Sequence, residues 1–298
     1  MDFLKYRYVF LILSLIIIVS GITYGFATGF RFDIDFKGGT KIQVDLKQEF
    51  NNTDIEKLVN NITGIKPLVQ KMSGGQSSVS ITTDVITEEV SNKIIEELKL
   101  KYPNMDEPST RNVQPSFGKE LIESAIIAIV VSLLAILLYI CVRFKVLGIT
   151  AGITAIISLI HDALIIIAIY GVFKFPINST FVAVLLTIIG YSINDTIIIY
   201  DRIRENKRKV TKSSDLKDTI NISIAQTMKR TLYTSLTTIA AILIVYIFAL
   251  FNNQEVLKEF SLPLTLGIIT GTYSSIFIAS SLWYILDNLK FNKFKKVK

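Results

Sequence analysis

The stretch TIIGYSINDTIIIYDRIREN, residues 187–206, decides how this chain folds, because it places the acidic Asp195 inside an apolar helix. About 20 mainly apolar residues, from roughly Thr180 to Tyr200, are enough to cross a bilayer at 1.5 Å rise per residue. Asp195 lies about 9 Å by helical rise from Asp201, where the apolar run ends. A carboxylate at this depth needs a partner, water or a proton.

Helical spacing places a polar stripe on one side of this segment, and we expect that stripe to face protein rather than lipid. Desolvation disfavours the charged form of a carboxyl, and ionisable groups within membrane spans are usually functional. We therefore interpret Asp195 as a proton relay, with Tyr191 and Asn194 as supporting polar residues. A structural Asp that hydrogen-bonds helices together is the alternative. The stripe consists of Thr187, Tyr191, Asn194, Asp195 and Ile198.

Composition predicts an integral membrane protein, since half of the 298 residues are apolar and only 19% are charged. Cys141 is the single cysteine, so we expect no disulfide framework, and nothing indicates a metal or a cofactor. The net charge of +7 indicates contact with anionic membrane lipids rather than with nucleic acid. Hydropathy predicts six spans, at about 8–27, 122–142, 146–170, 179–200, 233–251 and 262–286.

Lys and Arg are concentrated in the N-terminus, in the loops after the second and fourth spans and in the tail. The positive-inside rule then places both termini in the cytoplasm and the segment between the first two spans outside. The predicted organisation is a cytoplasmic N-terminus with the first span (1–28), an external domain (29–119), five further spans (120–289) and a basic cytoplasmic tail (290–298). Among the five spans, residues from about 201 to 232 are expected to form a cytoplasmic amphipathic segment that lies on the membrane surface.

The external domain reads as strand, helix, strand, strand, helix, strand, which is the pattern of an α+β ferredoxin-like domain. Its expected strands and helices fall at about 41–46, 53–61, 66–72, 78–83, 87–101 and 108–115. The domain contains no Cys or His and no Gly-rich phosphate loop before a helix. We therefore expect a protein-contacting or gating module and not an enzyme.

Three further sites complete the candidate set. His161 and Asp162 form a second ionisable pair at membrane depth, with Asp162 nearer the outer face and offset from Asp195 by on the order of 10 Å. The alternative interpretation is that His161 is a hydrogen-bonded core residue and not a ligand. Arg230 lies at the cytoplasmic end of the fifth span. It either belongs only to the general excess of Lys and Arg on the cytoplasmic side or pairs with an ionised Asp195. Gly267 and Gly271 have small-xxx-small spacing, which predicts close helix packing.

Five separated strings of this sequence resemble the SecF subunits of the bacterial SecD/SecF family of protein-export membrane proteins. The resemblance covers essentially the whole chain. One departure is that the family usually has a Gly before its IDF string, whereas this chain has Asp33 before residues 34–36. The strings are DIDFKGGT at 33–40, HD at 161–162, GYSINDTIIIYDRIREN at 190–206, QTMKRT at 226–231 and GIITGTYSSIFIA at 267–279.

The resemblance implies half of a resistance-nodulation-division-like transporter, whose six spans pair with six related spans of SecD beside the SecYEG channel. It also implies a bacterial cytoplasmic membrane, and use of the proton gradient to pull the translocating polypeptide outward. Asp195 then matches the family's proton-carrying Asp, Arg230 its functionally important Arg, and Asp162 its HD position. The external domain would contact or gate the emerging chain.

Two other functions remain open. Two Asp residues on adjacent spans are also found in intramembrane aspartic proteases, but these need both carboxylates at one depth and sharing a proton. The expected offset argues against that class, as does the absence of a GxGD string around Asp195. A passive assembly subunit, which holds partners together without using protons, is the other alternative.

Overall fold

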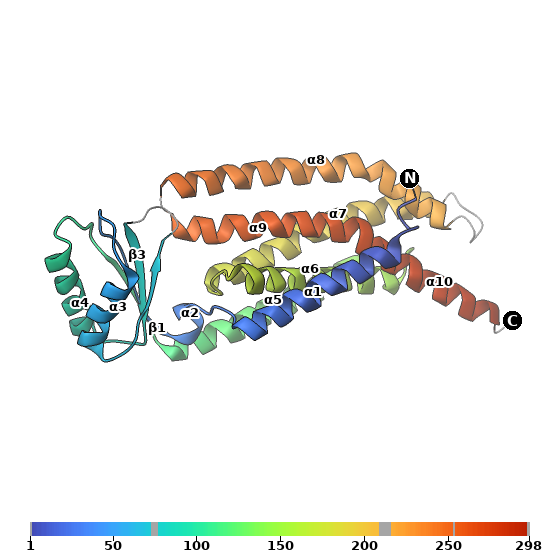
Figure 1. The fold of residues 1–298 in the computed structure, drawn as a ribbon. Helices are drawn as coiled ribbons and strands as arrows, with labels where there is room; N and C mark the ends of the chain where they lie inside the picture. The colour runs from blue at the N-terminus through green and yellow to red at the C-terminus, as the bar shows by residue number, and fades with distance from the viewer. Residues whose placement is uncertain (1, 73–76, 209–215, 253, 297–298) are drawn as a thin grey trace.

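The computed structural model describes residues 2–72, 77–208, 216–252 and 254–296. Six helices, each long and apolar enough to span a membrane, lie side by side, and a small α/β domain sits at one end of them (Figure 1). The first helix starts, and the last helix ends, at the opposite end of this bundle. The six helices coincide with the six predicted spans, which confirms a mostly helical, multi-span architecture.

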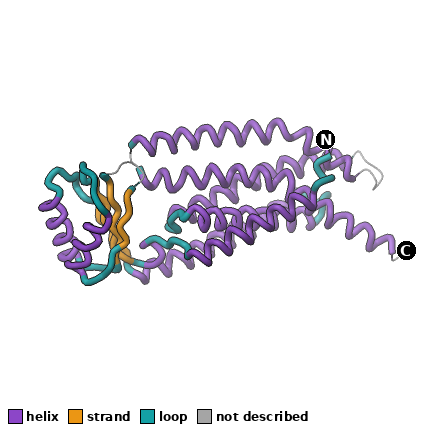
Figure 2. Tube along the Cα trace, in the orientation of Figure 1, coloured by secondary structure: helices purple, strands orange, loops and turns teal. Residues whose placement is uncertain are grey.

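The α/β domain contains all the strands of the described chain (Figure 2). Its four strands form one antiparallel sheet in the order β2-β3-β1-β4. Two helices separate them along the sequence. In chain order the elements are β1 (Gly39–Asp45), α3 (Asn52–Thr63), β2 (Leu68–Lys71), β3 (Ser78–Thr83), α4 (Glu88–Lys101) and β4 (Ser109–Val113).

The two faces of this sheet are covered by different parts of the molecule. Because successive side chains of a strand alternate between faces, Ile42 and Val44 of β1 pack with Ile81 of β3 against α3 and α4. Lys41 and Gln43 of β1 point to the other side, toward the helical bundle. Lys41 is consequently only 8% exposed, although a Lys in a predicted strand would normally be solvated.

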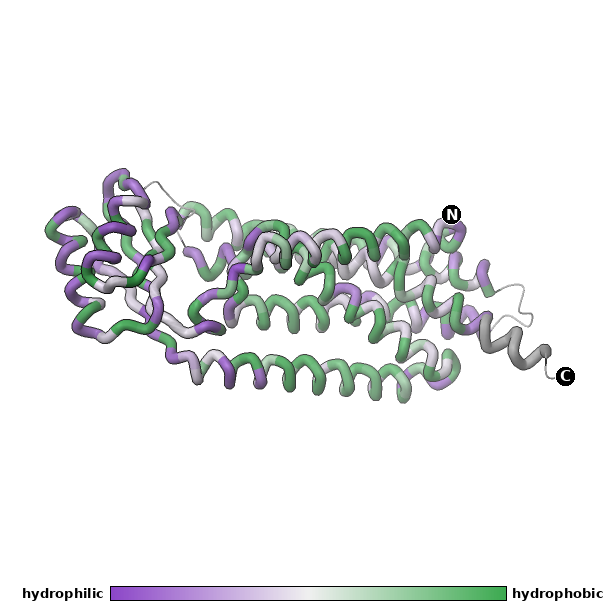
Figure 3. Tube along the Cα trace, turned by 60° about the horizontal axis from the view of Figure 1, so that its bottom comes forward, coloured by the Kyte–Doolittle hydropathy of each residue, from purple (hydrophilic) through white to green (hydrophobic). Residues whose placement is uncertain are grey.

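The helical bundle has an inner and an outer layer. The inner helices α6 (Ile149–Phe173), α7 (Ser179–Lys207) and α9 (Glu255–Tyr273) are buried far more than the outer helices α1 (Arg7–Thr28), α5 (Pro115–Arg143) and α8 (Leu216–Phe251). Figure 3 shows apolar residues along the middle of the bundle and hydrophilic residues toward its ends. The sixth span runs from α9 through the π-helix η2 (Ser274–Ala279) into α10 (Ser280–Lys296).

The amphipathic segment expected over 201–232 is not a separate helix. Residues 201–207 extend α7, and residues 216–232 are the first part of α8, which continues without a break into the fifth span. The apolar stripe at Ile220 and Ile224 is fully buried in the bundle core. The expectation of a helix lying on the membrane surface is therefore wrong, because the stripe packs on protein. Residues 209–215 lie outside the described chain, as do the side chains of the basic tail.

Close approach of α1 and α6 depends on small residues that the sequence reading overlooked. A Cβ added to Gly21 would stand 2.6 Å from the Ala168 Cβ, and one added to Gly171 would stand 3.0 Å from the Gly25 Cα. Contacts this short leave no space for a side chain. Small residues let two backbones pack closely where lipid supplies no hydrophobic driving force between helices.

The α/β domain is fastened to the bundle through Asp35 of the short helix α2 (Ile34–Lys37). Its carboxylate is 4% exposed and accepts hydrogen bonds from the Ser179 amide at 2.9 Å and the Ser179 hydroxyl at 2.6 Å, at the start of α7. Arg111 of β4 donates to the other oxygen at 3.0 Å. One carboxylate thus joins the sheet, α2 and the bundle.

Asp35→Ala is expected to destabilise the folded protein by about 2 kcal/mol, the typical contribution of hydrogen bonds to a charged group. Burial raises the pKa of Asp35, but the hydrogen bonds from Ser179 and the charge of Arg111 outweigh burial, so this pKa lies below its ordinary value of 3.8. The contribution is therefore complete above about pH 5 and is lost as the pH falls through the folded-state pKa.

Thermal unfolding of the detergent-solubilised protein between about pH 3 and pH 6 tests this prediction. The stability difference between wild type and Asp35→Ala should narrow as the pH falls. Asp84→Ala, which removes an exposed acid of the same domain, is the control and should leave stability unchanged. A difference that stays constant across this pH range would contradict the ionised role of Asp35.

Candidate functional site

Asp195 is completely buried among α7, α8 and α9. Its Oδ2 atom accepts a long hydrogen bond of 3.5 Å from the Thr272 hydroxyl of α9, and Thr272 in turn exchanges a hydrogen bond of 2.7 Å with Ser235 of α8. Its Oδ1 atom is buried and has no partner within the described residues. A buried carboxylate with one long hydrogen bond and one unpartnered oxygen has little to compensate the loss of contact with water.

Asp162 of α6 is also completely buried, but its surroundings differ. Its Oδ2 accepts hydrogen bonds from Ser192 of α7 at 2.5 Å and from Ser274 of η2 at 2.8 Å. Its Oδ1 lies 3.0 Å from Nδ1 of the neighbouring His161. Both oxygens are therefore occupied, and Asp162 holds three elements of the bundle together.

The two carboxylates lie closer in depth than the expected offset of about 10 Å. Asp162 is bonded to Ser192, which precedes Asp195 by one helical turn, about 4.5 Å of rise. Their partners Thr272 and Ser274 are two residues apart on the sixth span. The connection between α6 and α7 pairs at Ile177 with residues 31–33 as extended backbone.

No hydrogen bond joins the two carboxylates in the described part of the chain. Asp162 belongs to the network of Ser192, Ser274 and His161, while Asp195 belongs to that of Thr272 and Ser235. A shared-proton dyad requires the two oxygens in direct contact. The arrangement provides two separate buried acids instead of one protease-like pair.

Arg230 lies on the exposed surface of α8, where it lines a cleft of about 450 Å³ between α5, α7 and α8. Asn194, the residue before Asp195, lines the same cleft. Arg230 makes no ion pair with Asp195 within 4 Å in this conformation of the described residues. The cleft brings the guanidinium to the neighbourhood of Asp195 without contact.

The polar stripe of α7 does not face a single environment. Tyr191 is half-buried and donates to Thr238 of α8 at 3.2 Å, whereas Thr187 and Asn194 are exposed. Asp195, one residue further around the helix than Asn194, points inward. Within this chain the stripe faces protein at Tyr191 and Asp195 but not at Thr187 and Asn194, because one helical residue step turns the side chain by 100°.

The hydroxyl donors to the two acids were not among the candidate residues predicted from the sequence. Ser274 and Ser275 follow the predicted packing residues Gly267 and Gly271 in the string at 267–279. Ser274 donates to Asp162, and Ser275 donates to the Ser192 carbonyl oxygen at 3.1 Å. These serines begin η2, and π-helical turns are frequent at functional sites. The string TYSS at 272–275 carries the hydroxyls that the sixth span contributes, but spacing alone could not assign them.

The predicted packing glycines lie against α7 at the level of these networks. A Cβ on Gly267 would stand 2.0 Å from the Ile188 Cδ1, and one on Gly271 would stand 3.0 Å from the Ser192 Cβ. The Gly271 carbonyl also accepts from Ser274 at 3.0 Å. Within the described chain, no group of three His, Cys, Asp or Glu side chains is placed to hold a metal ion.

Comparisons with known proteins agree with this architecture. The family model described as "Protein export membrane protein SecD/SecF, C-terminal" matches residues 90–289. The protein translocase subunit SecF of Borreliella burgdorferi is 36% identical, over 100% of this chain and 98% of that protein. The SecF of Thermobaculum terrenum is 34% identical, over 97% of this chain and 95% of that protein.

A crystal structure of SecDF from Thermus thermophilus, described as a translocon-associated membrane protein, has a TM-score of 0.83 and 30% identity to this chain. The match covers 97% of this chain and 39% of that chain. The protein translocase subunit SecDF of Bacillus subtilis is 33% identical, over 95% of this chain and 37% of its own length. From the match of the family model and these full-length relatives, the chain belongs to the SecD/SecF family of protein-export membrane proteins.

Proposed function

We propose that this chain is a SecF-like subunit that uses the proton motive force to promote protein translocation together with SecD and the SecYEG channel. Membership of the family makes it an accessory membrane subunit of Sec translocation. Coupling to protons is supported by one observation above all. Asp195 is completely buried, makes no ion pair within 4 Å among the described residues and keeps an unpartnered carboxylate oxygen.

A proton cycle between Asp195 and Arg230 would supply the coupling. In the proposed cycle, a neutral Asp195 needs no countercharge, so its hydrogen bond to Thr272 suffices and the cleft beside Arg230 stays open. When Asp195 loses its proton, the buried anion needs a countercharge, and Arg230 is the cation placed to approach it. Each proton that crosses the membrane releases about 2.3 kcal/mol per 100 mV, enough to bias such a movement.

The proposed orientation places both termini in the cytoplasm of a bacterial cell and the α/β domain outside the cytoplasmic membrane. The positive-inside pattern supports it, as does the position of the α/β domain at the end of the bundle opposite the start of α1. The element order and the sheet order β2-β3-β1-β4 favour a ferredoxin-like class for that domain. In this orientation the domain can contact or gate the emerging polypeptide.

SecD is the expected partner in the membrane. The matched SecDF chains are more than twice as long as this one, and the match covers 40% and 39% of them. The exposed side of α7 offers a surface for it, because Thr187 and Asn194 are exposed and nothing lies within 4 Å of a Cβ added to Gly190. A partner helix on this side would also complete the protein surroundings expected for the polar stripe.

Export in membrane vesicles that contain the chain, SecD and SecYEG tests the proposed function. A preprotein is translocated with ATP, with and without an imposed proton gradient, and a protonophore then collapses the gradient. We expect the gradient to stimulate export only when both the chain and SecD are present. Equal stimulation in vesicles that lack the chain would leave it as a passive assembly subunit.

A further inference from the structure

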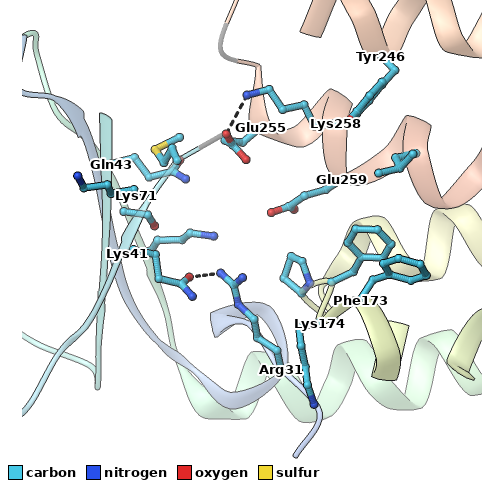
Figure 4. A pocket seen from close by; sticks show the side chains of 16 residues that line it. Arg31, Lys41, Gln43, Lys71, Phe173, Lys174, Tyr246, Glu255, Lys258 and Glu259 are labelled. Atoms are coloured by element: carbon cyan, nitrogen blue, oxygen red, sulfur yellow. Dashed lines mark hydrogen bonds and ion pairs between the residues drawn. The ribbon is translucent and has the colours of Figure 1, made fainter. Parts of the chain in front are cut away.

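A polar pocket of about 300 Å³ lies between the sheet of the α/β domain and the ends of α6, α8 and α9. Its walls come from both parts of the molecule, as Figure 4 shows: Arg31 and Lys41 reach in from the domain side, and Glu259 reaches in from α9. This size is at the small end of ligand-binding cavities. The pocket shares no lining residue with the cleft at Arg230, so the two are separate.

Four charged residues of this pocket form no ion pair within the described residues: Arg31, Lys71, Lys174 and Glu259. Lys174 donates to Thr28 and to the Gly29 carbonyl, and Lys71 lies over the Phe50 ring, which leaves Arg31 and Glu259. Lys41 is paired with Asp33 at 2.9 Å, and Lys258 is paired with Glu255 at 3.0 Å. Arg31, in contrast, donates only to the neutral Gln70 side chain. Glu259 accepts only from the neutral Asn178 side chain, at 2.6 Å.

Within the described residues, Arg31 and Glu259 have no ion pair, although both point into the same cavity. Both side chains are half-buried, and the Lys41 ammonium that acts on Glu259 is already paired with Asp33, so both charges are only partly compensated. A ligand that carries both signs would compensate both charges at once, with its anionic group at Arg31 and its cationic group at Glu259. A purely anionic ligand would meet the Glu259 carboxylate, and a purely cationic one would meet the Arg31 guanidinium.

The surroundings of the pocket indicate where such a ligand comes from. Phe173, Tyr246 and Leu262 contribute to its wall from the ends of three apolar helices, and Phe173 is 61% exposed on the outside of the bundle. Aromatic residues at the ends of spans are typical of the interface between hydrocarbon and lipid headgroups. Acyl chains could therefore lie along these helices while the headgroup enters the pocket.

We propose that this pocket binds the headgroup of an aminophospholipid, with the phosphate at Arg31 and the primary ammonium at Glu259. The planar guanidinium suits a phosphate because it presents two parallel donors. A primary ammonium can donate hydrogen bonds to Glu259, whereas a quaternary choline cannot. The bound headgroup would bridge the α/β domain and the bundle and so fix their relative position.

The test uses the purified full-length chain in nanodiscs that contain either phosphatidylethanolamine or phosphatidylcholine in a phosphatidylglycerol background, followed by native mass spectrometry of retained lipid. We expect one retained phosphatidylethanolamine, and at least about tenfold weaker retention in Glu259→Gln and in Arg31→Gln, the effect of losing one charged hydrogen bond. Glu259→Gln keeps an acceptor for Asn178, so the fold should persist. Glu97→Gln and Lys99→Gln, exposed on α4, make the same charge changes away from the pocket and should retain the lipid.

Several results would overturn the proposal. Equal retention by wild type and both pocket variants would show that the lipid binds elsewhere. Equal retention of phosphatidylcholine would exclude recognition of the primary ammonium. Displacement by soluble glycerophosphoethanolamine at the same concentration would make a free zwitterion the ligand instead of a lipid. Normal domain docking in the exchanged pair Arg31→Glu with Glu259→Arg, without any retained lipid, would indicate a direct latch between the two residues.

Discussion

Asp195→Asn is expected to reduce export in the presence of a proton gradient to the rate measured without one. Asn has nearly the shape of Asp and keeps an oxygen that can accept the hydrogen bond from Thr272, but it cannot bind and release a proton. The ATP-driven part of export should persist, because the fold and the association with SecD do not depend on the charge of Asp195. Vesicle export at matched expression and matched SecD association measures the effect.

Asp201→Asn is the matched control for this experiment. Asp201 lies six residues further along α7, is partly exposed and is already paired with Arg143 and Arg204 at the end of the span. Its replacement removes a carboxylate from the same helix without touching the buried site, so gradient stimulation should remain. If Asp195→Asn also retains gradient stimulation, Asp195 serves only in helix packing and the passive assembly subunit becomes the better account.

Gly271→Leu is expected to destabilise the bundle by about 3 kcal/mol or more, the range of severe overpacking in a membrane or soluble core. The first added carbon would stand 3.0 Å from the Ser192 Cβ, and the rest of the side chain has no space between α7 and α9. Moving these helices apart would separate Ser192 from Asp162 and Thr272 from Asp195. Export should therefore fall together with thermal stability.

Thermal unfolding of the purified chain measures this effect, with Gly190→Leu as control. Gly190 is in the middle of α7, and nothing lies within 4 Å of a Cβ built on it. Its replacement by Leu should leave the stability of the isolated chain unchanged or slightly higher, since Gly is a poor helix former. Similar losses of thermal stability in both variants would mean that Gly271 does not stabilise the protein through close packing of α7 against α9.

Local patterns were sufficient for much of the architecture. The six spans are set by the length of apolar runs, which is a property of consecutive residues. Alternation placed the strands of the α/β domain, and Thr87 was correctly recognised as a helix start, since its hydroxyl accepts from the Val90 amide. The same approach failed at residues 201–232, because a stripe at Ile220 and Ile224 looks the same whether it packs on lipid or on protein.

The sequence by itself determined that the chain spans a membrane six times, that an α/β domain lies between the first two spans, and that Asp195 lies inside the fourth. Only the tertiary structure decided which groups contact the acids: Thr272 at Asp195, and Ser192 with Ser274 at Asp162. It also placed Arg31 opposite Glu259, residues more than 200 positions apart. The physical reason is that hydropathy and periodicity describe one helix or strand at a time. Contacts between helices depend on their crossing and on the register set by η2, which no local pattern encodes.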